Sequence, residues 1–267
     1  MIYSGLFRDS ELMLLTLLDT VAQYGSDHEV VILGNGTVVP DISGYEAIVI
    51  NTKLFSSAQV CRNICITAST GDIIIWIDDD IEVCEGYIDA FTKPFDEDPS
   101  VGIAGYECLA IQEDFGNQWF IDGNSNKFDY VDSPYAIRRD MVKAIGGYDE
   151  GLGMSSCDNT DLCLRAVASG WKMGLIENPG IKHYRQGTFS SPKLPYNKSR
   201  EDVKSWEHMV RKYPPGWKNR YGLATKSVIV DEGLQFPDRL GRLGGPEDKK
   251  PVNRDGYMFG IKRVLHL

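Results

Sequence analysis

Residues 69–80 of the chain read STGDIIIWIDDD and contain the clearest strand signal in the sequence. Its centre, residues 73–77, is five apolar residues in a row, most of them β-branched, between a glycine turn and a run of acids. An uninterrupted apolar run of this kind, bounded by glycine and charges, is typical of a strand buried on both faces. The run ends directly in Asp78-Asp79-Asp80, so the strand brings three carboxylates to one edge of its sheet.

Strands and helices alternate along the chain before this stretch. Apolar runs at residues 1–6, 29–33 and 47–50 predict three more strands. One helix is predicted from Ser10, because apolar residues recur there at helical spacing, and a second from about Ser57. The apolar face of the first helix consists of Leu14, Leu17, Leu18 and Val21. The alternation predicts an α/β fold with a mostly parallel sheet flanked by helices.

The chain becomes less regular after residue 98. We predict strands at residues 101–110, 135–137 and 173–176, and helices at residues 139–145, 159–169 and 200–212. Prolines at positions 192, 195, 214 and 215 break the chain beyond Gly187. We therefore expect one α/β domain over residues 1–187 and a loop-rich extension with one helix over residues 188–267.

Composition and charge narrow the class of protein. The chain of 267 residues is 42% hydrophobic and 25% charged, as globular domains are, which excludes wholesale disorder. Lys+Arg 28 against Asp+Glu 38 gives a net charge of −10, the wrong sign for a general nucleic-acid coat protein. Residues 239–267 carry seven Lys/Arg and three Asp/Glu, a basic tail on an acidic body. We interpret it as solvated, with contact to phosphate or an anionic surface as the alternative.

Location and redox state are also indicated. No apolar run is long enough to span a bilayer, and no basic signal-peptide region begins the chain, so we expect a cytoplasmic protein. The six cysteines have neither CxxC spacing nor histidines at zinc-finger distance, and we interpret them as reduced packing residues.

The acidic run Asp78-Asp79-Asp80 is the strongest chemical signal. Adjacent carboxylates repel one another, so burying them without a cation is costly. The carboxyl ends of strands are also where α/β sheets bind ligands. A hard divalent cation that bridges the carboxylates and a diphosphate satisfies both facts. An exposed acidic turn that caps the following helix is the alternative.

Several segments of the chain, in the same order as in the family, resemble GT-A fold glycosyltransferases, chiefly glycosyltransferase family 2. Residues 69–80 resemble the family's core, in which Gly-Asp, an apolar strand and Asp-Asp-Asp follow one another. Cys61-Arg62-Asn63 stands where the family often has Ala-Arg-Asn. The remaining matches are residues 138–150, which resemble its Arg-Arg to Gly-Gly-Phe/Tyr-Asp-Glu segment, residues 158–165, which resemble Glu-Asp-x-Asp-Leu-x-x-Arg, and then Gly170-Trp171 and Ile181-Lys182-His183. The resemblance implies a GT-A catalytic domain over residues 1–187, followed by a lid loop and a C-terminal extension.

The resemblance also implies a chemistry: a sugar is transferred from a nucleotide-diphosphate donor with the help of a metal ion. Asp78 and Asp80 would hold Mn(II) or Mg(II) against the diphosphate, with His183 as the third protein ligand. Asp79 and Arg62 would contact the donor. The metal would act as a Lewis acid and stabilise charge on the leaving diphosphate.

The segment expected to supply the catalytic base departs from the family. Asp158 stands in the place of the family's Glu, and Asn159 in the place of its Asp, which is the base of many inverting members. We assign Asp158 as the base, with a helix N-cap role as the alternative. Retaining polypeptide N-acetylgalactosaminyltransferases have a similar Glu-Asn pair, so inversion is only slightly favoured over retention. Asp161 is expected to orient or cap its helix.

The segment expected to bind the nucleotide also departs from the family pattern. Asn35, in Gly34-Asn35-Gly36-Thr37, replaces the acid with which the family commonly recognises the nucleotide base. On family frequency we expect a UDP-sugar donor, with guanosine left open. The acceptor is undetermined among a saccharide, a lipid-linked sugar, a protein and a modified nucleic acid. A non-catalytic GT-A-like binding module and a sugar-1-phosphate nucleotidyltransferase are the alternative functions.

Aromatic side chains are candidates for stacking on an acceptor sugar, although single aromatic residues more often belong to a core. None is assigned to binding. The candidates are Trp119, Phe120, Trp171, Tyr184 and Trp206.

Overall fold

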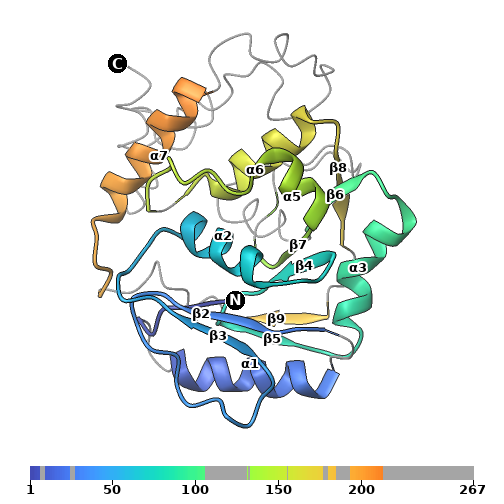
Figure 1. Cartoon of the computed structure of the whole chain (residues 1–267), viewed down its shortest axis with the longest axis vertical. Helices are drawn as coiled ribbons and strands as arrows, with labels where there is room; N and C mark the ends of the chain where they lie inside the picture. Colours follow the sequence, from blue (N-terminus) through green and yellow to red (C-terminus); the bar gives the residue numbers. More distant parts are fainter. Residues whose placement is uncertain are drawn as a thin grey trace, which may run out of the picture.

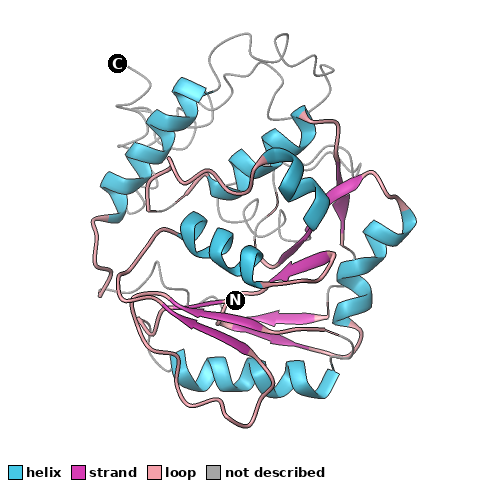
Figure 2. Ribbon diagram, in the orientation of Figure 1, coloured by secondary structure: helices cyan, strands magenta, loops and turns pink. Residues whose placement is uncertain are grey.

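A computed structural model of the chain describes residues 1–6, 10–24, 28–105, 131, 133–154, 156–176, 180–184 and 193–212. Helices lie on both sides of the strands (Figure 2). The expected α/β class is therefore confirmed. Among these residues, no helix is both long and apolar enough to cross a membrane.

The first sheet, sheet A, is parallel throughout. It contains β1 (Ile2–Tyr3), β2 (Val31–Gly34) and β3 (Ile48–Asn51), in the order β1-β2-β3. Helix α1 (Ser10–Tyr24) lies below these strands and α2 (Ala58–Ala68) above them (Figure 1). Successive residues of β2 face the two helices, because Ile32 packs with Leu14 and Leu18 of α1, whereas Leu33 packs with Cys61 and Cys65 of α2.

The second sheet, sheet B, is mixed. Its strands are β4 (Ile73–Trp76), β6 (Val101–Gly105), β7 (Tyr135–Arg138) and β8 (Lys172–Leu175), in the order β4-β7-β6-β8. Strand β7 runs antiparallel to β4 and β6, whereas β6 and β8 are parallel. The prediction of parallel pairing thus holds for sheet A and not for β7.

Burial of β4 also differs from the prediction. Ile73, Ile74 and Ile75 are half-buried, and only Trp76 is buried. The prediction that both faces are fully covered is wrong for the first three residues. The physical reason is that β4 lies at the edge of sheet B, where neighbouring side chains cover a strand less completely.

Three helices cover sheet B. Helix α3 (Tyr87–Glu97) packs Phe91 and Phe95 against β6 and β7. Helices α5 (Arg139–Ile145) and α6 (Asp158–Ala168) join the core that also contains α2 and residues of β4, β6 and β7. A single apolar core therefore connects the α2 face of sheet A with the α5 and α6 face of sheet B.

A small sheet and one more helix complete the described part. Strands β5 (Ile81–Val83) and β9 (Ile181–His183) form a two-stranded antiparallel sheet directly after the acidic run. Helix α7 (Lys198–Lys212) lies beside α6 and the loop that precedes it (Figure 1). This loop, residues 149–154, is called the α6 loop below.

Candidate functional site

The acidic run follows β4 and enters the interior. Asp78 is half-buried, whereas Asp79 and Asp80 are 4% and 1% exposed. These carboxylates therefore do not form the exposed turn that the sequence left as an alternative. Their position at the carboxyl end of a strand is where α/β proteins place ligands.

Asp79 is the residue of this run with the least favourable environment. The backbone N–H of Ser4, at the end of β1, donates to its carboxylate. Its Oδ2 is buried and has no hydrogen-bond partner among the described residues. Burial, followed by repulsion from Asp78 and Asp80, raises the pKa of Asp79 to about 8. One buried carboxylate oxygen of the run therefore lacks a hydrogen-bond donor among the described residues, and three adjacent acids repel one another.

Strand β9 brings the chain back beside Asp80. The register places His183 opposite Ile81, the residue after Asp80. The N–H of Tyr184 donates to the carbonyl oxygen of Asp80 over 2.9 Å. The backbone thus brings the predicted ligands Asp80 and His183 close together, whereas the side chain of His183 lies outside the described part.

The fit to a metal ion depends on the chemistry of the donors. Among the described side chains, no group of three or more His, Cys, Asp or Glu converges to hold a metal ion. Asp78 and Asp80 nevertheless offer carboxylate oxygens, the hard ligands that Mg(II) and Mn(II) prefer. The raised pKa of Asp79 shows that a positive charge here would relieve repulsion. The residues present therefore fit a divalent cation.

Arg62 of α2 is held in an aromatic cage. Its guanidinium lies 5.6, 5.8 and 5.3 Å from the ring centres of Trp76, Tyr135 and Tyr148. These distances are within the range of cation–π attraction. Burial raises the pKa of both tyrosines, whose hydroxyls are hydrogen-bonded to each other. The cage therefore holds a permanent cation between neutral rings.

Arg62 also contacts the start of α6. Its Nη1 is ion-paired with Oδ2 of Asp158 and donates to Oδ1 of Asn159 over 3.1 Å. The side chains of Arg62 and Asp158 are only 10% and 16% exposed. The structure thus brings together two residues that the sequence placed in the donor site and in the role of catalytic base.

The backbone that leads into Asp158 is strained. Ser156 and Cys157 both have positive φ, 59° and 66°, in the left-handed region that residues with a Cβ rarely adopt. Consecutive residues of this kind persist only where their surroundings enforce them, and they cluster at functional sites. Here they turn the chain so that α6 begins with Asp158 beside Arg62. Cys157, not Asp158, occupies the N-cap position.

Asn35 has a structural task at the end of β2. Its Nδ2 donates to the carbonyl of Ser56, and its Oδ1 accepts from the N–H of Ser56. The neighbouring glycines are required by space, because a Cβ on Gly34 would lie 2.5 Å from the Thr37 carbonyl and one on Gly36 2.7 Å from the Phe55 nitrogen. Any contact of Asn35 with a nucleotide base would have to use its remaining hydrogen-bonding capacity.

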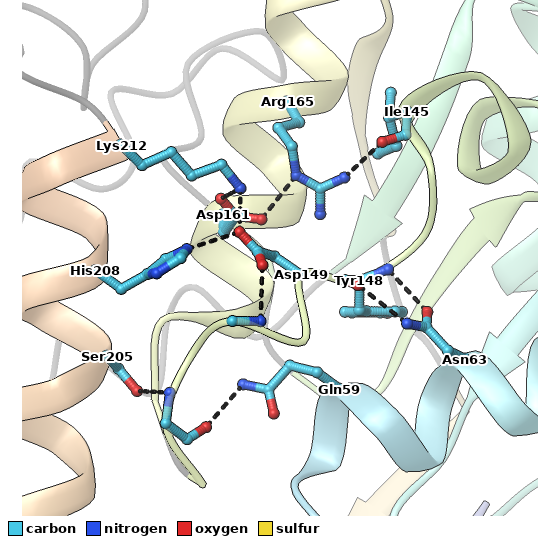
Figure 3. A network of polar contacts seen from close by, with 12 residues as sticks. Gln59, Asn63, Ile145, Tyr148, Asp149, Asp161, Arg165, Ser205, His208 and Lys212 are labelled. Atoms are coloured by element: carbon cyan, nitrogen blue, oxygen red, sulfur yellow. Dashed lines mark hydrogen bonds and ion pairs between the residues drawn. The ribbon is translucent and has the colours of Figure 1, made fainter.

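A polar network joins α6, the α6 loop and α7 (Figure 3). Asp149 accepts from His208 over 2.9 Å and is ion-paired with Lys212. Lys212 also lies 2.7 Å from Asp161, which is fully buried and ion-paired with Arg165 over 2.7 Å. Asp161 thus orients its helix, as expected. No sequence signal pointed to Asp149 or Lys212 as its neighbours.

Several residues of the site were missed, and some predicted ones lie outside the described part. The sequence did not indicate the cage rings Trp76, Tyr135 and Tyr148 as site residues, because aromatic residues in or beside predicted elements more often belong to a core. Of the aromatic candidates, Trp119, Phe120 and the side chain of Trp206 lie outside the described residues. Trp171 packs against the core. The hydroxyl of Tyr184 donates a hydrogen bond to the carboxylate of Glu82, in β5.

Comparison with solved structures confirms the GT-A fold. The mannosyltransferase PcManGT from Pyrobaculum calidifontis, in complex with GDP-Man and Mn2+, is similar over 87% of this chain and 68% of its own, with a TM-score of 0.63 and 15% identity. GalNAc-T7 with UDP, GalNAc and Mn2+ is similar over 95% of this chain, with a TM-score of 0.58 and 12% identity. This chain spans 54% of the length of GalNAc-T7.

A third similar structure is that of residues 1–349 of TarS from S. aureus, with a TM-score of 0.51, 14% identity and coverage of 97% of this chain and 88% of that one. No family model and no curated protein sequence matches the chain. The likeness at these identities establishes the fold, which is the GT-A fold that the sequence motifs predicted.

Proposed function

We propose that the protein is a metal-dependent glycosyltransferase that moves a sugar from a nucleotide-diphosphate donor to an acceptor. The observation that carries this proposal is the buried acidic run at the end of β4, in which Oδ2 of Asp79 has no hydrogen-bond partner among the described residues. In a GT-A fold, that edge of the sheet is where a donor diphosphate and its cation would lie.

Asp78, Asp80 and His183 are the residues that would hold Mn(II) or Mg(II). When bound, the ion supplies Lewis-acid stabilisation of charge on the leaving diphosphate. Support for this arrangement comes from the carboxylate donors and from the β9 register, which returns His183 to the position opposite Ile81. Asp79, at the centre of the run, would contact the donor.

Arg62 and Asp158 would act together as one ion-paired unit beside the reacting sugar. Arg62 occupies Oδ2 of Asp158, which leaves Oδ1 as the oxygen that would accept the acceptor's proton in an inverting reaction. Arg62 would at the same time present positive charge toward the donor. Asn159 accepts from the same guanidinium and has no proton-accepting carboxylate, so it is assigned a positioning role.

The donor nucleotide is proposed to be a uridine or guanosine diphosphate sugar. The similar structures carry both kinds: GDP-Man on PcManGT, UDP on GalNAc-T7 and UDP-GlcNAc on TarS. Because Asn35 is already paired with Ser56, its contribution to base selection would be weaker than that of a free acid.

The proposal is tested by hydrolysis of nucleotide sugars in the absence of an acceptor. We expect release of nucleoside diphosphate from one donor of a UDP- and GDP-sugar panel, dependent on Mn(II) and lost in Asp80→Asn. Asp140→Asn is the matched control, because the Asp140 side chain is 79% exposed. Release of pyrophosphate from a nucleoside triphosphate and a sugar 1-phosphate, with formation of a nucleotide sugar, would instead identify a nucleotidyltransferase. Donor binding without turnover would identify a binding module.

A further inference from the structure

A groove of about 390 Å³ lies between α2, the α6 loop and α7. Its walls come from Phe55, Ser56, Ser57 and Val60 at and before the start of α2, residues 150–154 of the α6 loop, and Glu201 and Lys204 of α7. It is distinct from the acidic run, none of whose residues lines it.

The groove is built from close packing of the α6 loop on α7. A Cβ on Gly153 would lie 2.4 Å from the carbonyl oxygen of Glu201, so only glycine permits this approach. The N–H of Gly153 donates to Ser205 over 3.1 Å, and the N–H of Met154 donates to Glu201 over 3.2 Å. These contacts hold the α6 loop, which forms one wall of the groove, against α7.

Two walls of the groove come from α2, which carries Arg62, and from the α6 loop, which precedes the helix that begins with Asp158. Gln59, three residues before Arg62 on α2, donates to the carbonyl of Gly153 over 3.4 Å. Gln59 and Ser205 reach the α6 loop from opposite sides (Figure 3). The same loop continues through the strained turn to Asp158. A molecule in the groove would therefore lie beside the elements that carry the proposed base.

The lining combines an apolar surface with ionised carboxylates. Phe55 is half-buried, and its ring lies 5.9 Å from that of Tyr196. Burial opposes ionisation of Glu201, but hydrogen bonds from Lys204 and Met154 outweigh it and lower its pKa. Glu150 accepts from Asn63 over 2.7 Å through one of its two oxygens. A carboxylate has about four acceptor sites, so both acids keep capacity for further hydroxyl donors.

The charge of the groove lining distinguishes among the acceptor classes. The lining contains two glutamates and one lysine, and that lysine is paired with Glu201. The excess of negative charge disfavours nucleic acid and other anionic acceptors. Apolar and aromatic surface beside carboxylate acceptors suits the C–H face and the hydroxyl groups of an uncharged sugar.

We propose that this groove binds an uncharged saccharide as the acceptor. The inference rests on the proposed glycosyltransferase function and names its acceptor class. Phe55 contributes the surface for a sugar face, and Glu150 and Glu201 accept from sugar hydroxyls.

Binding is tested with the full chain by saturation-transfer NMR, using maltose, cellobiose, mannobiose and diacetylchitobiose as probes and no donor. We expect at least one probe to bind the wild type and to bind Phe55→Ala about tenfold more weakly, as the loss of a ring contact implies. Glu201→Gln should also weaken binding. Leu54→Ala is the matched control, since Leu54 is 78% exposed and does not line the groove. Circular dichroism of each variant verifies folding.

Two results would overturn the inference: absence of binding of every probe to the wild type, or equal binding to the wild type, Phe55→Ala and Glu201→Gln. Manganese-dependent nucleotide binding by the wild type is measured on the same sample. If nucleotide binds and the probes do not, the acceptor assignment fails while the proposed function stands. If the probes bind and no nucleotide does, the proposed function fails while a saccharide site stands.

Discussion

The guanidinium of Arg62 is ion-paired with the carboxylate of Asp158, which lies 96 positions further along the chain. The pair ties α2, which covers sheet A, to α6, which covers sheet B. Three aromatic rings lie around the guanidinium, and the Arg62 side chain is 10% exposed. The two halves of the fold therefore meet at a charged contact that is also part of the proposed reaction site.

Removing one member of this pair should lower the stability of the folded protein. We expect Arg62→Ala to lower the free energy of unfolding by about 3–5 kcal/mol, because it leaves a carboxylate of low exposure without its partner. Urea denaturation measures the change. Lys93→Ala is the matched control, since the Lys93–Glu97 pair is exposed and should contribute about 0.5 kcal/mol or less. Equal stability of the two variants would contradict the account of the cage.

The contact between the α6 loop and α7 should be intolerant of a side chain. In Gly153→Ala the new Cβ would meet the Glu201 carbonyl at 2.4 Å, and we expect a loss of about 1–3 kcal/mol of stability. Thermal unfolding measures it. Gly44→Ala is the control, because a Cβ on Gly44 meets nothing within 4 Å, and its effect should stay within about 0.5 kcal/mol. A Gly153→Ala protein as stable as Gly44→Ala would show that α7 does not pack closely on this loop.

The network around Asp149 predicts how stability responds to acid. Burial opposes ionisation of Asp149, but hydrogen bonds from Lys212, His208 and Gly151 outweigh it and lower its pKa. Because its pKa is lower in the folded chain than in the unfolded one, the folded state binds fewer protons. The group therefore stabilises the protein above about pH 4, and this contribution is lost as the pH falls toward the folded pKa.

The measurement is the free energy of unfolding from pH 7 down to the acid range. We expect Lys212→Met to lower stability at pH 7 and to make the acid-induced loss shallower, since less stabilisation is left to lose. Lys143→Met is the control, because Lys143 is 69% exposed and pairs with an exposed aspartate. An unchanged acid slope in Lys212→Met would mean that Lys212 does not hold Asp149 in its ionised form.

Local sequence signals predicted most of the elements well. Helix α1 buries Leu14, Leu17, Leu18 and Val21, the residues at helical spacing, and α5 has the predicted bounds, 139–145. Its end at Gly146 follows from the positive φ of 83° there. Helix α3 was missed because Pro94 lies inside it and interrupts the helical pattern.

The sequence proposed candidate site residues but not their pairings. Motif order singled out Arg62, Asp78, Asp80 and Asp158, because each lies in a short segment that resembles a motif of the family. Their roles stay predictions. The ion pair of Arg62 with Asp158 depends on how two helices on different sheets meet, and residue spacing carries no information about that. The division at Gly187 stays a prediction, although α7 beyond it is joined to the α6 loop by the Asp149–Lys212 contact.

We propose that the acidic run binds a cation together with a nucleotide diphosphate. The most direct test of this proposal is thermal stabilisation of the full chain by UDP and GDP, with and without Mn(II). A ligand that binds only the folded state adds about 2.7 kcal/mol at a hundredfold excess over Kd. We predict a manganese-dependent shift for one nucleotide in the wild type and in Asp140→Asn, and none in Asp80→Asn. A shift that persists in Asp80→Asn, or no shift for either nucleotide, would contradict the account.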